Sequence, residues 1–158
     1  MGSLLLVRNP IMFHLVSLSQ SLILALGTSD RASFTCELDE ARNILSTPRD
    51  TPLQIGVGYL GWMLDEGGNS VDTLHVALEQ RVSSIWLSFG NDLGKWVETI
   101  RQYDQNRKEA HKTLVWILVN TVAEAEVASN KWKADVLVVQ GKSLTVSYEF
   151  FFRNVLLA

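Results

Sequence analysis

Short apolar runs and amphipathic runs alternate through the middle of this chain. Four apolar runs have the length of buried strands, and they lie at 54–60, 84–89, 113–119 and 135–140. Alternating β and α units are typical of a parallel sheet covered by helices. We therefore expect these four strands to be parallel, adjacent in sequence order and joined by right-handed helical crossovers.

The segments between these runs place apolar residues three or four positions apart, as on one face of a helix. The expected stripes are Leu38, Ala41 and Leu45, then Val71, Leu74, Leu78 and Val82, then Leu93, Trp96, Val97 and Ile100. Asn91 or Asp92 is positioned to cap the third helix. The polar run 104–109 is interpreted as a solvated connection.

Thr121 and Glu124 have the spacing of a capping box. In that motif the threonine oxygen accepts from the Glu124 amide, and the carboxylate reaches back to the Thr121 amide. A helix is therefore expected to begin there, supported by Val122, Ala125 and Trp132. The run before it, 113–119, is continuously apolar, as expected of a strand buried on both faces.

Tryptophans occur in both kinds of element. Trp86 and Trp116 fall in the middle of expected strands, where packing between layers is the default. Trp62 follows a glycine-rich strand end, so it could wall a ligand pocket or pack in the core equally well.

The glycines at 56, 58 and 61 match the G-x-G-x-x-G dinucleotide fingerprint. That fingerprint needs a strand before the first glycine and a helix beginning at the last one. Few apolar residues precede Gly56, and the residues after Gly61 run into two more glycines. We therefore interpret the segment as a strand end where backbone lies close to a neighbour or a ligand.

Composition narrows the function classes. A chain of 158 residues with 47% hydrophobic content is expected to form one domain with a real core. The net charge of −3 with dispersed basic residues argues against nucleic-acid binding. The single cysteine, Cys36, excludes an internal disulfide and a cysteine-based zinc site, and it fits a reducing, cytoplasmic compartment. Arg8 and Pro10 interrupt the apolar segment 3–26, which argues against a membrane span or a signal peptide.

The residues that most often carry chemistry do not form a recognisable site. His14, His75 and His111 lack a carboxylate partner or metal-ligand spacing, so no metal is expected. Cys36 lies at a helix start, where a thiolate could be stabilised, but no basic partner is evident and a packed thiol is expected.

Four segments, taken in order, resemble the fungal branch of the nitronate monooxygenase family, which are 2-nitropropane dioxygenase-like flavoproteins. These segments are 37–45, 53–62, 85–90 and 135–141. The resemblance implies a TIM (β/α) barrel that binds FMN and oxidises alkyl nitronates with dioxygen. It covers residues 35–141, and about half of the barrel strands are expected there.

The resemblance also assigns site residues. Gly58 matches a strand-end position near the flavin, and Gln140 and Gly141 match the start of the family's Gln-Gly-x-Glu-Ala-Gly-Gly-His segment. Lys142 and the residues after it replace the rest, so the histidine that would be the catalytic base is absent. We expect a divergent segment at 1–34, a partial barrel at 35–141 and an unpatterned tail at 142–158. Residues 1–30 and 142–158 are expected to pack less regularly than the middle.

The expected activity follows from these losses. The chain is interpreted as a truncated nitronate monooxygenase-type oxidoreductase that binds FMN weakly or not at all and is inactive. The alternative is a non-catalytic barrel remnant that acts, if at all, through association of exposed sheet edges with another chain.

Overall fold

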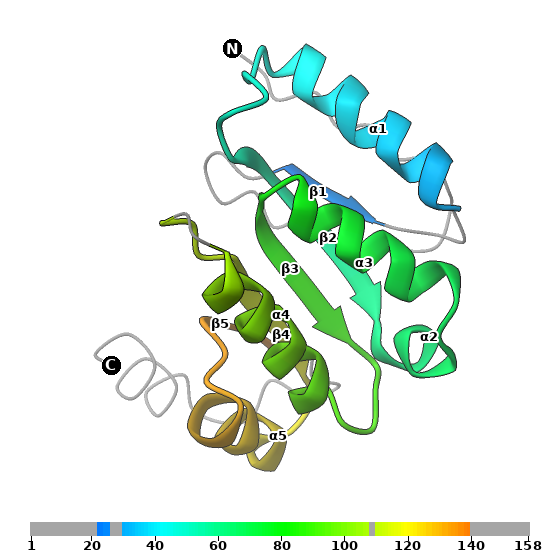
Figure 1. Cartoon of the computed structure of the whole chain (residues 1–158). Helices are drawn as coiled ribbons and strands as arrows, with labels where there is room; N and C mark the ends of the chain where they lie inside the picture. The colour runs from blue at the N-terminus through cyan, green and yellow to red at the C-terminus, as the bar shows by residue number, and fades with distance from the viewer. Residues whose placement is uncertain (1–21, 26–29, 108–109, 140–158) are drawn as a thin grey trace.

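The computed structural model describes residues 22–25, 30–107 and 110–139 (Figure 1). Within these ranges five strands form one sheet in the order β1-β2-β3-β4-β5, and every neighbouring pair is parallel. The strands are β1 Leu22–Ala25, β2 Leu53–Leu60, β3 Val82–Ser88, β4 Leu114–Val119 and β5 Val136–Val139.

Four of these strands are the ones predicted from the apolar runs. The prediction that they are parallel and adjacent in sequence order is confirmed. β1 lies in the amino-terminal segment, for which the sequence predicts no definite element, and it pairs with β2 from Leu22 opposite Ile55 to Ala25 opposite Gly58.

Helices connect successive strands. They are α1 Arg31–Ile44, α2 Gly61–Glu66, α3 Asn69–Glu79, α4 Gly94–Asn106, α5 Val122–Glu126 and the π-helix η1 Val127–Lys131. Figure 1 shows α1, α3 and α4 on the same side of the sheet. A doubly wound sheet reverses its strand order at a switch point and carries helices on both faces. The order of the described strands does not reverse, so each new strand is added at the same edge of the growing sheet. The fold class is α/β, without the switch point of a doubly wound sheet among the described strands.

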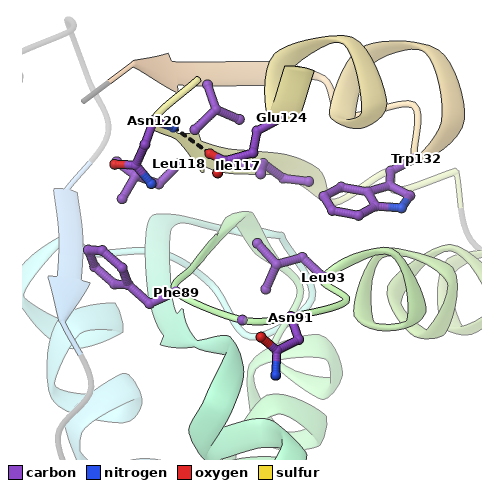
Figure 2. Close-up of a pocket in the computed structure, with 10 residues that line it drawn as sticks. Phe89, Asn91, Leu93, Ile117, Leu118, Asn120, Glu124 and Trp132 are labelled. Atoms are coloured by element: carbon purple, nitrogen blue, oxygen red, sulfur yellow. Dashed lines mark hydrogen bonds between the residues drawn. The ribbon is translucent and has the colours of Figure 1, made fainter. Parts of the chain in front are cut away.

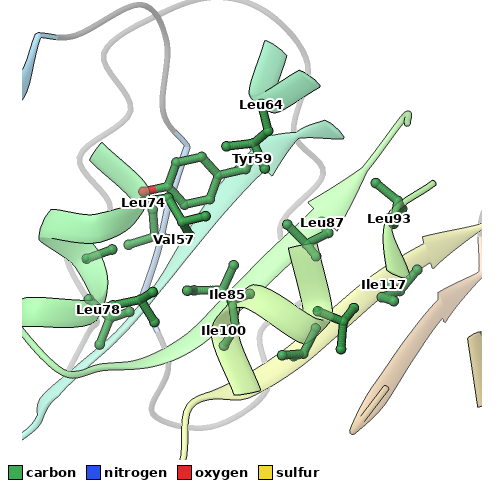
Figure 3. Close-up of a cluster of buried hydrophobic side chains, with 14 of the residues drawn as sticks. Val57, Tyr59, Leu64, Leu74, Leu78, Ile85, Leu87, Leu93, Ile100 and Ile117 are labelled. Carbon is green, nitrogen blue, oxygen red and sulfur yellow. The ribbon is translucent and has the colours of Figure 1, made fainter. Parts of the chain in front are cut away.

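The sheet face that carries the helices, here called the near face, holds the main core. Strand residues that alternate along β2, β3 and β4 pack against the apolar stripes of the helices (Figure 3). The fully buried members include Phe34, Leu38, Val57, Leu74, Leu78, Ile85, Leu87, Ile100 and Ile117. Burying such side chains stabilises the fold by about 1.5–3 kcal/mol each.

α1 begins at Arg31, well before the first residue of the predicted stripe, because Asp30 caps it. The Asp30 carboxylate accepts from the Ser33 amide at 2.9 Å. Leu38 is buried as predicted, but the prediction for Leu45 is wrong, since the helix ends at Ile44 and Leu45 is 42% exposed. The next buried residue after Leu38 on this face of α1 is Arg42.

The next two helices also differ from the predicted stripes at their ends. α3 ends at Glu79, so Val82 is a buried residue of β3 and not of the helix. Leu93 stands at the N-cap of α4 without a side-chain cap. Asp92 still supports the turn, because its Oδ1 atom accepts from the Gly94 amide at 3.1 Å.

β4 is not buried on both faces, so that prediction is wrong. Val115, Ile117 and Val119 are at most 1% exposed, whereas Leu114 is 41% exposed and Leu118 is partly exposed. A continuous apolar run does not show which of its residues face the covering helices and which face the opposite side of the sheet.

The predicted solvated connection at 104–109 is wrong for its first residues, since α4 continues to Asn106. Asp104 turns inward and its carboxylate accepts from the Thr113 amide at 2.7 Å and from the Thr113 hydroxyl at 3.1 Å. The carboxylate therefore connects α4 to the segment that enters β4.

Asp135 anchors the amino end of β5. Its carboxylate accepts from the Val115 amide at 2.7 Å and from Lys112 Nζ at 2.6 Å, and it also pairs with Arg101 of α4. Burial alone would raise the pKa of Asp135, but the hydrogen bonds from Lys112, Val115 and Arg101 together hold the pKa below its usual value.

Within the described ranges no helix has the length and apolar character needed to cross a bilayer.

Candidate functional site

The face opposite the described helices, here called the far face, has a different composition from the near face. Gly58, Trp86 and Trp116 lie in one row across β2, β3 and β4, because Gly58 pairs with Trp86 and Trp86 with Trp116. The two indole rings lie 6.4 Å apart between centroids at an interplanar angle of 36°. Neither tryptophan belongs to the near-face core.

Gly58 leaves room beside its backbone. A Cβ atom built on Gly58 would meet no other atom within 4 Å. Its neighbours on the same face of β3 include Ser84 and Ser88, which are small and buried. The far face at β2 and β3 is therefore a strip of small residues beside two large aromatic rings.

Both indole nitrogens in this row lack a hydrogen-bond partner. Trp86 Nε1 and Trp116 Nε1 are buried, and neither donates a hydrogen bond. A buried donor without an acceptor costs about 1–3 kcal/mol. An acceptor supplied by a bound molecule would remove that cost.

Of the three predicted flavin-contacting residues, the structure describes only Gly58. Gln140 and Gly141 lie outside the described residues, so their proximity to Gly58 stays a prediction. The tail at 142–158 and most of the amino-terminal segment, residues 1–21 and 26–29, also lie outside the described residues.

A pocket lies at the carboxyl edge of β3 and β4, where a parallel sheet usually places ligands. Its volume is about 310 Å³. It is lined by Phe89, Gly90, Asn91, Leu93, Ile117, Leu118, Val119, Asn120, Glu124 and Trp132 (Figure 2). Sequence reasoning missed this pocket, because its lining comes from the loop after β3, the end of β4, helix α5 and the turn after η1.

Two glycines hold the ends of β2 and β3 together beside this pocket. A Cβ atom on Gly61 would lie 2.8 Å from Gly90 Cα and 2.4 Å from a Leu93 methyl group. The Trp62 amide donates to the Phe89 carbonyl at 3.1 Å across the same junction. Only glycine fits at such a close approach.

This geometry revises the interpretation of the glycine-rich segment. A strand does precede Gly61 and helix α2 does begin there, so the objection that no helix follows is wrong. Gly56 and Gly58 lie inside β2, however, and Gly61 packs against Gly90. The segment is a strand end in contact with its neighbour, as interpreted, and it does not form a phosphate-binding turn.

The capping box is present with one change of partner. Thr121 Oγ1 accepts from the Glu124 amide at 3.2 Å, as predicted. The Glu124 carboxylate accepts from the Asn120 amide at 2.6 Å and not from the Thr121 amide (Figure 2). The carboxylate therefore reaches one residue further back, onto the end of β4, and it lines the pocket.

Two tryptophans are placed differently from the pocket prediction. Trp62 is 48% exposed and does not line the described pocket. Trp132 lines it instead and packs on α4, where a Cβ atom on Gly94 would lie 2.2 Å from the Trp132 Nε1 atom.

The described histidines and the cysteine lie away from the pocket. The His75 ring contacts Tyr103, and His111 Nε2 lies 3.2 Å from the Val82 carbonyl oxygen. Burial lowers the pKa of His111. Cys36 is exposed, so the prediction of a packed thiol is wrong.

Among the described residues no group of three or more histidine, cysteine, aspartate or glutamate side chains is arranged to hold a metal ion. Comparisons of the chain with protein-family models, with curated proteins and with solved structures found no match.

Proposed function

We propose that this chain is a nitronate monooxygenase-type flavin protein whose far face binds the ring of FMN. The observation that supports this most directly is the place of Gly58. The resemblance assigns Gly58 to the flavin, and Gly58 lies in one row with two indoles and has free space where a side chain would stand. A planar ring system can approach a backbone closely only where no side chain intervenes.

The residues of this row fit a flavin ring in their hydrogen-bonding capacity. The isoalloxazine ring carries carbonyl oxygens and ring nitrogens that accept hydrogen bonds. Trp86 Nε1 and Trp116 Nε1 are buried donors without acceptors. Bound FMN would supply the redox chemistry, and the two indoles would orient its ring and exclude water.

The phosphate of FMN has no assigned partner in this proposal. In TIM barrels the phosphate is usually held by loops after strands seven and eight, and five strands are described here. In addition, the segment after Gln140 lacks the Glu-Ala-Gly-Gly-His run that would supply the catalytic base. We therefore expect weak binding through the ring and no oxidation of nitronates.

The test is a fluorescence titration of FMN and of riboflavin with the purified chain. Weak, saturable binding of similar affinity for both flavins is expected, since only the ring is held. Gly58→Leu places a side chain in the free space and should weaken binding at least about tenfold, equal to roughly 1.4 kcal/mol. Gln54→Leu, on the same strand and exposed, is the matched control.

Failure to bind either flavin while circular dichroism shows a folded chain would overturn the proposal, as would equal binding by Gly58→Leu. Oxygen uptake with an alkyl nitronate should stay at the background rate. Flavin-dependent uptake would show that a catalytic base is supplied by a residue not identified here.

The alternative is association through the sheet edges, and β5 is the observation in its favour. All four residues of β5 are apolar, Val139 is 51% exposed, and among the described strands β5 pairs only with β4. An apolar strand with a free edge can pair with another chain. Sedimentation velocity should then show oligomers that Val139→Lys dissociates, whereas a monomer at all concentrations would remove this alternative.

A further inference from the structure

The pocket at the carboxyl edge of β3 and β4 is rich in hydrogen-bond acceptors. Glu124 contributes a carboxylate, and Asn91 and Asn120 contribute side-chain amides whose oxygens accept hydrogen bonds. No lysine, arginine or histidine is among its described lining residues. The charge of the lining is therefore negative.

The rest of the lining is apolar. Leu93, Ile117 and Val119 lie beneath the surface and are at most 4% exposed, whereas Phe89, Leu118 and Trp132 keep accessible apolar surface. Figure 2 shows Phe89 at one end of the pocket and Trp132 at the other, with Glu124 between them. The pocket thus combines one anionic group with aliphatic and aromatic surfaces.

Phe89 holds an unusual backbone conformation at this edge. Its φ angle is +53°, in the left-handed region, and its side chain is 52% exposed. That region costs a residue with a Cβ atom about 1–2 kcal/mol. Such strain is concentrated at ligand-binding positions, and here it places an aromatic ring at the mouth of the pocket.

We propose that this pocket binds a primary ammonium ion that carries a compact apolar body. An ammonium group has three donors and no acceptor. The Glu124 carboxylate supplies the charged acceptor, and Figure 2 shows it between Phe89 and Trp132. The apolar body lies on the accessible surfaces of Phe89, Leu118 and Trp132, and an aromatic body gains most from the two rings.

An anion is disfavoured in this pocket, because the Glu124 carboxylate repels it. The pocket is also separate from the proposed flavin row, since Gly58, Trp86 and Trp116 are not among its lining residues. The inference is therefore independent of the proposed flavin function, and either can fail alone.

The experiment compares three ligands with the same aromatic body by NMR titration of the full chain. They are 2-phenylethylammonium, the neutral 2-phenylethanol and the anionic 3-phenylpropanoate. We expect the ammonium to bind about threefold to fivefold more tightly than the alcohol, since Glu124 is exposed to solvent and such ion pairs are worth up to about 1 kcal/mol. The carboxylate should bind most weakly.

Glu124→Gln isolates the charge, because glutamine also serves in a capping box. It should remove the preference for ammonium over alcohol. Glu126→Gln is the matched control, since it removes the same charge from the same helix at an exposed residue outside the pocket lining. If Glu124→Gln and Glu126→Gln lose the same preference for ammonium, only the net charge of the helix matters, and the proposal is overturned.

Asn91→Asp tests the proposal without touching the cap. Asn91 is exposed and lines the pocket, so an added carboxylate should tighten ammonium binding about threefold. Unchanged ammonium affinity in this variant, or equal binding of the ammonium, the alcohol and the carboxylate by the unaltered chain, would overturn the proposal.

Discussion

The two faces of the same strands differ in composition and in what covers them. On the near face, residues such as Ile85 and Ile117 are fully buried against helices. On the far face, one residue further along each strand, Trp86 and Leu118 stay partly exposed. On the near face, apolar strand residues pack against the apolar stripes of the helices. Around the Gly58 row, the far face carries glycine, serine and tryptophan, and no apolar stripe of a described helix packs against them.

Parallel sheets are usually covered on both faces. The described helices cover the near face. On the far face, the two indole N–H groups lack an acceptor, so a bound hydrogen-bond acceptor would stabilise the protein most there. The near face should therefore govern stability, and the far face should govern binding. The first two of the following predictions compare one position on each side, and the third concerns the edge strand β5.

The largest difference is expected between two neighbouring residues of β4. Ile117→Ala on the near face should lower the free energy of unfolding by about 3 kcal/mol, because it leaves a cavity in a fully buried position. Leu118→Ala on the far face should cost about 1 kcal/mol, because Leu118 is partly exposed. Chemical denaturation measures both values, and equal losses would mean that the far face is packed as tightly as the near one.

A smaller difference is expected between two glycines. Gly94→Ala should destabilise the fold by about 1–3 kcal/mol, since the new methyl group would overlap the Trp132 ring. Gly58→Ala should change stability by less than about 0.5 kcal/mol or raise it, since its Cβ atom meets nothing within 4 Å. Thermal unfolding of the two variants decides this, and a large loss in Gly58→Ala would show that the space is already filled.

The smallest expected effect is a pH-dependent loss of stability when Asp135, which anchors the edge strand β5, is replaced by asparagine. The pKa of Asp135 is lowered in the folded protein, so the carboxylate stabilises the fold above its unfolded pKa of about 3.9. This contribution is lost as the pH falls through the lower folded pKa. Asp135→Asn should therefore cost about 1–2 kcal/mol at pH 7.

The difference between the native chain and Asp135→Asn should shrink below about pH 4. Unfolding by urea between pH 3 and 7 measures it. A difference that stayed constant across this range would show that the hydrogen-bond geometry of the aspartate matters and its charge does not.

Four of the five described strands and their order could be predicted from the sequence, because short apolar runs alternate with helical stripes. β1 could not, because its segment carries no consistent period. The helix ends were harder, since the cap residue and not the apolar stripe decides where a helix begins. Asp30 moves the start of α1 to Arg31, and Glu124 reaches Asn120 because of local backbone geometry that spacing alone does not give.

The site could be predicted only in part. The resemblance alone assigned Gly58 to the flavin, and that assignment stays a prediction. The structure places Gly58 inside β2, with free space where a side chain would stand. The pocket could not be predicted, because Phe89, Glu124 and Trp132 come together only through the pairing of β3 with β4 and the packing of Trp132 against Gly94. These contacts join residues far apart in the chain, and no local pattern predicts them.

The unreversed strand order also bears on how the chain folds during synthesis. Each described strand pairs with the one made before it, so β2 can dock on β1 and β3 on β2 without waiting for a distant segment. Contacts between neighbours in sequence form faster than distant ones, and domains generally fold as the amino-terminal part emerges first. A ribosome that pauses after β4 would therefore present a sheet whose last edge is ready for the next strand.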